Sequence, residues 1–99
     1  MKRLDDECLV MEFEWDDAKN TLNIEKHGID FDDAIAIWEG PVHIRPSPRH
    51  GEIRWVAVGV ADGIEIAVIY TERGAVKRLI SARRARKNER RTYRQAYSH

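Results

Sequence analysis

Most of the fold is decided by one stretch, Ile53-Arg-Trp-Val-Ala-Val-Gly-Val-Ala-Asp-Gly-Ile-Glu-Ile-Ala-Val-Ile-Tyr-Thr71. It holds two apolar runs, residues 53–60 and 64–71, that are rich in β-branched side chains. Asp62-Gly63 lies between them, and this dipeptide between two such runs predicts a β-hairpin with a tight turn. The centre of the molecule is therefore expected to be an antiparallel pair of strands.

Further strands extend this hairpin on both sides. A second turn at Glu72-Arg73-Gly74 leads into the alternating segment Val76–Ser81, and Val42–Arg45 forms a short strand upstream. Residues 46–51 are expected to form a loop, because the two prolines in this segment cannot donate to a β-ladder. Four strands with such short connections predict an antiparallel meander, since parallel neighbours need long crossovers.

Helical patterns precede the strands. After a short alternating segment at Glu12–Trp15, Asp16 is a suitable N-cap for a first helix, which Gly28 ends. Asp30 begins a second helix, which Gly40-Pro41 ends. Apolar residues of this second helix recur at i, i+3, i+4 and i+7, which predicts one buried face. They are Phe31, Ala34, Ile35 and Trp38.

A basic helix is predicted to end the chain, from about Ala82 to Tyr97, with Ser81 as its N-cap. One of its faces combines small and aromatic residues, and another carries arginine and lysine. The predicted fold class is α+β, with two N-terminal helices, an antiparallel β-meander of about four strands and a C-terminal basic helix. The first face is formed by Ala82, Ala85, Glu89, Tyr93 and Ala96.

The 99 residues suffice for one domain, which we assign to residues 11–99. Residues 1–10 are polar and precede a second methionine, Met11, so we expect an N-terminal extension or disordered arm; an edge strand around Cys8-Leu9-Val10 is the alternative. The single cysteine fits a reducing cytosol, and no apolar run is long enough to span a membrane. We therefore expect a cytoplasmic protein that does not insert into membranes.

Charge is divided along the chain, although the formal net charge is zero. Residues 73–99 hold ten Lys/Arg and one acid, Glu89, whereas residues 1–33 hold eleven Asp/Glu and four Lys/Arg. A single acid cannot pair with all the cations of the last helix. Contact with nucleic acid or with an acidic partner is therefore an alternative to a merely solvated charged surface.

The end of the first helix is a candidate for chemistry. Lys19, Asn23 and Lys26-His27 recur at helical spacing, and the helix carbonyls at this end favour a protonated imidazole. His27 either transfers protons or merely hydrogen-bonds the helix end. The sequence predicts no metal site and no cofactor, because it has no Cys/His cluster and no Gly-rich phosphate loop.

Two arginines in predicted strands are further candidates. Arg54 lies within an apolar run, and Arg78 alternates with apolar residues. Each side chain either pairs with a carboxylate, for which Glu65 and Glu89 are candidates, or lines a groove open to phosphate. The sequence leaves both interpretations open.

Two blocks of motifs, taken together, are specific for one family. The first consists of Phe13-Glu-Trp-Asp16, Lys19, Asn23, Lys26-His27-Gly28 and Phe31. The second consists of Glu52-Ile-Arg54, Gly59, Thr71-Glu-Arg73, Arg78, Ile80-Ser-Ala-Arg83, Glu89-Arg90 and Tyr93. They resemble the BrnT toxins from Met11 to about Tyr97, which is nearly the whole chain.

The resemblance implies a RelE-like, metal-independent endoribonuclease, the toxin of a type II toxin–antitoxin pair that inhibits translation and growth. It also implies neutralisation by a BrnA-like ribbon-helix-helix antitoxin. The expected complex holds two copies of each chain and contacts operator DNA only through the antitoxin. The alternative function is a non-catalytic module that binds nucleic acid or docks a partner.

For the nuclease, we hypothesise attack of the ribose 2′-OH on the adjacent phosphate. Lys26 or His27 is expected to transfer protons, and the sequence does not decide which is acid and which is base. The residues expected to bind phosphate and stabilise its charge are Arg54, Arg73, Arg78 and Arg83. Further contacts to RNA are expected from Lys19, Arg84, Arg86, Lys87 and Arg90.

Overall fold

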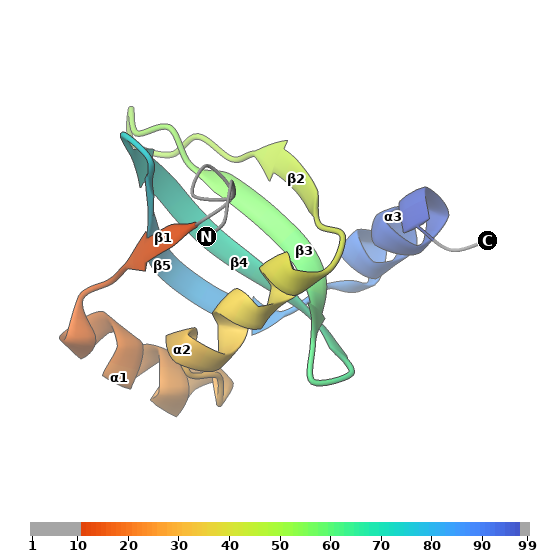
Figure 1. Ribbon diagram of the computed structural model, residues 1–99, viewed down its shortest axis with the longest axis horizontal. Helices are drawn as coiled ribbons and strands as arrows, with labels where there is room; N and C mark the ends of the chain where they lie inside the picture. Colours follow the sequence, from red (N-terminus) through yellow and green to blue (C-terminus); the bar gives the residue numbers. More distant parts are fainter. Residues whose placement is uncertain (1–10, 98–99) are drawn as a thin grey trace, which may run out of the picture.

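The predicted hairpin forms the centre of a five-stranded sheet in the computed structural model, which describes residues 11–97 (Figure 1). Its strands are β1 (Glu12–Glu14), β2 (His43–Pro46), β3 (Trp55–Ala61), β4 (Ile64–Arg73) and β5 (Val76–Arg84). They lie in the order β1-β5-β4-β3-β2. The predicted antiparallel meander is confirmed for β2 to β5, and β1 adds a parallel neighbour to β5 at the edge.

The first helix forms as predicted. It is α1 (Asp17–His27), and the carboxylate of Asp16 accepts hydrogen bonds from the backbone N–H groups of Ala18 and Lys19. Gly28 ends the helix in the left-handed region, at a φ of 72°, and its N–H donates to the carbonyl of Ile24.

The predicted extension at residues 1–10, with its alternative edge strand, lies outside the described residues. No helix among residues 11–97 is long and apolar enough to cross a membrane.

The second predicted helix changes type partway along. It begins as α2 (Phe31–Ala34) after the N-cap Asp30 and continues as the 3₁₀ helix η2 (Ile35–Glu39). A 3₁₀ helix has three residues per turn, so Ile37 follows Phe31 and Ala34 on the buried side. All three are fully buried. This helix packs directly on β3, since a Cβ added at Gly59 would lie 2.8 Å from the Cβ of Ile37.

The predicted start of the last helix is wrong. The backbone stays in β5 as far as Arg84, and the helix α3 (Lys87–Tyr97) begins three residues later. Ser81 is therefore a strand residue and not an N-cap. The ladder to β4 continues at Ala82 and Arg83, and this pairing overrides the local helical pattern. The start of α3 is instead capped by Glu89, whose Oε1 accepts the N–H of Arg86 at 2.8 Å.

Two strand boundaries also differ from the prediction. Pro46, expected in a loop, ends β2 by pairing with Trp55. A proline is compatible with this position because β2 is an edge strand. β3 begins at Trp55 and not at Ile53, so Arg54 immediately precedes it. The carbonyl of Arg54 still accepts the N–H of Ser47 at 2.7 Å, which continues the pairing beyond the strand.

The two faces of the sheet are covered differently. On one face, α2 and η2 pack against Ala57, Val68 and Leu79 in the main core. On the other face, Ala85 and Tyr93 pack against Val56, Val58 and Ala67. We call this second face the α3 face. Figure 1 shows α3 at one end of the sheet, away from α1 and α2. Within the described residues, α3 thus covers only one part of this face.

Asn23 fixes α1 to the free edge of β5. Its Nδ2 donates to the carbonyl of Ala82 at 2.9 Å, and its Oδ1 accepts the N–H of Ala82 at 3.1 Å. The side chain of Asn23 is buried and also donates to the carbonyl of Ile29. The amide therefore takes the place of a neighbouring strand at this position.

We expect Asn23→Ala to lower the free energy of unfolding by about 2–4 kcal/mol, because two buried backbone groups lose their partners. Denaturant unfolding of the purified protein measures this. Asn88→Ala, the same change at an exposed position of α3, should alter stability by no more than about 0.5 kcal/mol. Equal losses in the two variants would contradict the role given to Asn23.

Candidate functional site

A β-bulge brings arginines that are far apart in β5 onto the α3 face. In the β4–β5 ladder, Ile69 pairs with Ser81, but the next residue, Tyr70, pairs with Leu79, so Ile80 is the extra residue. Arg78 and Arg83 are five residues apart and would point to opposite faces of a regular strand. With the bulge between them, both point to the α3 face.

The register of the sheet adds arginines from the other strands. Arg73 pairs with Val76, and Val76 lies two residues before Arg78 in β5, so Arg73 is on the same face as Arg78. Arg45 pairs with Val56, which is also on this face. Arg54 precedes Val56 by two residues, which continues the alternation to the same face. This array is the candidate phosphate-binding surface. It consists of Arg45, Arg54, Arg73, Arg78 and Arg83.

Two of these arginines make exposed ion pairs. The Nε of Arg54 donates to Oε1 of Glu52 at 2.6 Å, and Nη1 of Arg78 donates to Oε2 of Glu14 at 2.9 Å. The partners expected from the sequence, Glu65 and Glu89, were therefore wrong. Both glutamate side chains are 41% exposed, and such pairs contribute about 0–1 kcal/mol each. A phosphate can therefore displace either carboxylate at little cost.

The surroundings of Glu52 link the arginines to α1. The hydrogen bond from Arg54 lowers the pKa of Glu52, and the charges of Arg73 and Lys19 act in the same direction. A positive charge lowers the pKa of a carboxylate appreciably only when the two groups lie close together, since solvent and salt screen the interaction. Lys19, Arg54 and Arg73 therefore belong to one positively charged region.

Arg83 has a different kind of partner. Its Nη1 and Nη2 donate to the two oxygens of Glu89 at 2.7 and 2.9 Å, and Nη2 of Arg45 donates to Oε2 at 3.0 Å. The side chain of Glu89 is 2% exposed. The hydrogen bond from Arg83 lowers its pKa to about 2, in spite of its burial. Glu89 is therefore an anchor between α3 and the sheet that is charged at neutral pH.

The grouping predicted at the end of α1 is confirmed. Lys19, Lys26 and His27 line a shallow pocket of about 250 Å³ together with Asn23 and Ser81. Burial lowers the pKa of His27, and the charges of Lys26 and Arg83 lower it further. Burial and these two charges act against the protonated imidazole that the helix carbonyls favour. The neutral ring can accept a proton near neutral pH.

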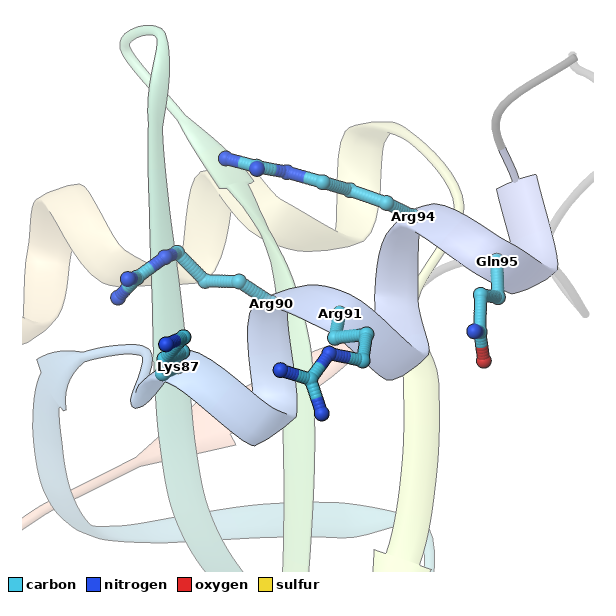
Figure 2. A pocket seen from close by; sticks show the side chains of 5 residues that line it. All are labelled: Lys87, Arg90, Arg91, Arg94 and Gln95. Atoms are coloured by element: carbon cyan, nitrogen blue, oxygen red, sulfur yellow. The ribbon is translucent and has the colours of Figure 1, made fainter.

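The other predicted RNA contacts lie elsewhere. Lys87 and Arg90 line a basic pocket of about 420 Å³ on the outer side of α3 (Figure 2). In the same pocket, Arg94 is held by Glu65 at 2.6 Å, and Arg90 donates to the carbonyl of Ala85 at 2.7 Å. The remaining lining residues are Arg91 and Gln95. Arg84 is exposed beside Arg90, and Arg86 is exposed just before α3.

Sequence reasoning missed Arg45 and Arg91, and it named Glu89 only as a candidate partner of Arg54 or Arg78. Alternation along β2 could have placed Arg45 on one face, but not opposite Val56, since the register was unknown. Glu89 is the one acid beside ten Lys/Arg in residues 73–99, which is a signal for a structural carboxylate. Among the described residues, no three His, Cys, Asp or Glu side chains are grouped so as to hold a metal ion.

A family model and solved structures both match the chain. A model of the family described as "Ribonuclease toxin, BrnT, of type II toxin-antitoxin system" matches residues 15–89. Among solved structures, the chain is similar to the 1.1 Å crystal structure of the Brucella abortus ribonuclease toxin BrnT, with 33% sequence identity and a TM-score of 0.60. That match covers 79% of this chain and 100% of the other. No curated protein sequence matches the chain.

Proposed function

The chain belongs to the BrnT family of ribonuclease toxins of type II toxin–antitoxin systems, and we propose that it cleaves RNA without a metal ion. Family membership implies an RNA substrate and an antitoxin partner. The observation that best supports the proposed site is the position of His27. It shares a pocket with Ser81, and the charge of Arg83 lowers its pKa. A proton acceptor thus lies near Arg83, one of the arginines of the α3 face.

The proposed reaction needs a proton acceptor and a proton donor. The ribose 2′-OH transfers its proton to the imidazole of His27 while its oxygen forms a bond to phosphorus. The bond from phosphorus to the 5′ oxygen breaks, and the leaving oxygen takes a proton from the ammonium group of Lys26. The products are a 2′,3′-cyclic phosphate and a 5′-hydroxyl. We give the acceptor role to His27 because its lowered pKa favours the neutral ring.

The arginines stabilise the negative charge that develops on phosphorus oxygens. Arg54 and Arg78 exchange their exposed glutamates for phosphate, and Arg73 adds charge beside them. Arg83 keeps its bond to Glu89 and acts through a fixed charge. Cations held in place before the reaction generally supply a large part of such catalysis.

Cleavage of end-labelled single-stranded RNA by the purified protein in EDTA tests this proposal. We expect fragments that end in a 2′,3′-cyclic phosphate. RNA that is bound and stays intact, also after Mg²⁺ is restored, would favour a non-catalytic nucleic-acid-binding module. The basic pocket of α3 is the observation that supports this second candidate.

His27 should set the acidic limb of the pH profile. Its pKa is lowered, so the neutral acceptor persists below the ordinary value of 6.5, and kcat/KM should begin to fall only below that pH. Lys26→Gln also removes the proposed proton donor, so its activity should be low; because it removes one of the charges that lower this pKa, the limb of the residual activity should shift upward. If His27→Ala and Lys26→Ala both retain full RNA cleavage and toxicity, neither residue transfers the proton.

We also propose that the antitoxin is a BrnA-like ribbon-helix-helix protein. The expected complex holds two copies of each chain and contacts operator DNA through the antitoxin. Co-expression with the product of the adjacent gene should then restore growth that the toxin alone arrests. Light scattering of the purified complex would measure its stoichiometry.

A further inference from the structure

Arg45 lies across the α3 face from the pocket of His27. In the sheet, Arg45 is opposite Val56, which is opposite Ile69, and Ile69 is opposite Ser81. Ser81 lines the pocket of His27. One row of residues therefore crosses the sheet from that pocket to the strand of Arg45, a backbone distance of three strand spacings or about 14 Å. The guanidinium of Arg45 extends back over the sheet to Glu89, which it shares with Arg83.

The side chain of Arg45 is oriented and still accessible. Its Nη2 donates to Glu89, and among residues 11–97 its Nε and Nη1 make no hydrogen bond. The side chain is 40% exposed. Glu89 is itself held by both Nη atoms of Arg83 and by the N–H of Arg86. The guanidinium of Arg45 is thus held in place on one side and free to bind on the other.

We propose that Arg45 binds a second phosphate of the RNA, at least one nucleotide away from the scissile phosphate, and that Glu89 positions it. This inference rests on the proposed ribonuclease function. The planar guanidinium suits phosphate, and a single-stranded RNA presents phosphates at regular intervals along its backbone. An RNA bound at the His27 pocket and lying along the row would bring another phosphate to Arg45.

The test compares Arg45→Gln with Arg49→Gln, a control of equal charge change in the connection formed by residues 47–54. Arg49 lies outside the strands of the sheet and contacts His50. Binding of a 2′-O-methylated RNA oligonucleotide, which cannot be cleaved, is measured over a range of salt concentrations. We expect Arg45→Gln to weaken binding about tenfold and to reduce the salt slope by about 0.7, the contribution of one phosphate contact. Arg45→Lys keeps the charge and should keep the slope.

A dinucleotide substrate separates Arg45 from the chemistry. It has one phosphate, which is bound at the His27 pocket, so loss of Arg45 should slow its cleavage far less than it weakens oligonucleotide binding. The inference is overturned if Arg45→Gln and Arg49→Gln have the same salt slope, or if Arg45→Gln slows dinucleotide cleavage as much as it weakens oligonucleotide binding. If the wild-type protein cleaves no RNA but the slope still falls in Arg45→Gln, the second phosphate site stands and the ribonuclease proposal fails.

Loss of fold would not imitate these results. Removing Arg45 leaves Glu89 paired with both Nη atoms of Arg83, so Arg45→Gln should unfold at the temperature of the wild-type protein. If Arg45→Gln unfolds at a lower temperature than the wild-type protein, Arg45→Lys provides the test instead. A lysine that restores the fold but not the salt slope would overturn the inference.

Discussion

Arg78→Ala is expected to lower kcat for RNA cleavage by about 10²–10³, the usual cost of removing one preorganised charge-stabilising group. Arg78 lies on the α3 face two residues before the bulge at Ile80, and its row continues to Thr71 in β4. Its pair with Glu14 is exposed, so the truncation should change the free energy of unfolding by no more than about 1 kcal/mol. Single-turnover kinetics with saturating enzyme measures the chemical step directly.

Glu14→Gln is the matched control, because it breaks the same 2.9 Å ion pair from the other side. If the pair is only a structural contact, both variants should lose activity equally, which would contradict the role of Arg78 in catalysis. If Glu14 merely occupies the place of a phosphate, its removal should leave kcat intact and lower KM.

Glu89→Gln is expected to lower the free energy of unfolding by about 3 kcal/mol. The substitution is nearly isosteric but removes the negative charge that Arg83 and Arg45 share in a buried position. Breaking a buried ion pair by removing one partner typically costs about 3–5 kcal/mol, since the remaining charge loses its compensation. Urea unfolding at pH 7 measures the loss. Glu72→Gln, which breaks a more exposed pair with Lys77, should cost no more than about 1 kcal/mol.

The pH dependence of the same variant gives an independent measurement. The pKa of Glu89 is about 2 in the folded protein and near 4.5 when unfolded. Its contribution is therefore fully present above about pH 4.5 and is lost as the pH falls toward 2. Each unit of difference corresponds to about 1.4 kcal/mol, so the contribution is again about 3 kcal/mol. A Glu89→Gln protein that keeps the full acid sensitivity of the wild type would contradict this role.

Local chemistry explains which parts of the fold were predictable. Asp16 and Gly28 bound α1, and Asp62-Gly63 forms the central hairpin, because capping and turn preferences act between residues close in sequence. The last helix was predicted to begin five residues too early. Residues 82–84 were expected to form its first turn, but they pair with β4. A local helical pattern does not show that a partner strand is present.

The features of the candidate site likewise divide into those that local sequence predicted and those that depend on residues distant in sequence. The helical spacing of Lys19, Asn23 and Lys26-His27 was enough to group them, and the structure confirms their shared pocket. The lowered pKa of His27 was not predictable, since it depends on burial and on Arg83, which is distant in sequence. The partners of Arg54 and Arg78 were likewise wrong. The sheet brings Glu14 of β1 to Arg78, whereas Arg54 pairs with Glu52, two residues before it in the same connection.

By itself, the sequence determined the α+β class, the order of most helices and strands, and the separation of an acidic first third from a basic last quarter. Only the tertiary structure decided that Arg78 and Arg83 share one face, that Glu89 is an anchor and that Arg45 lies in line with the His27 pocket. The physical reason is the period of two in a β-strand. One bulged residue reverses the face of everything beyond it, and no local pattern in β5 predicts the bulge at Ile80.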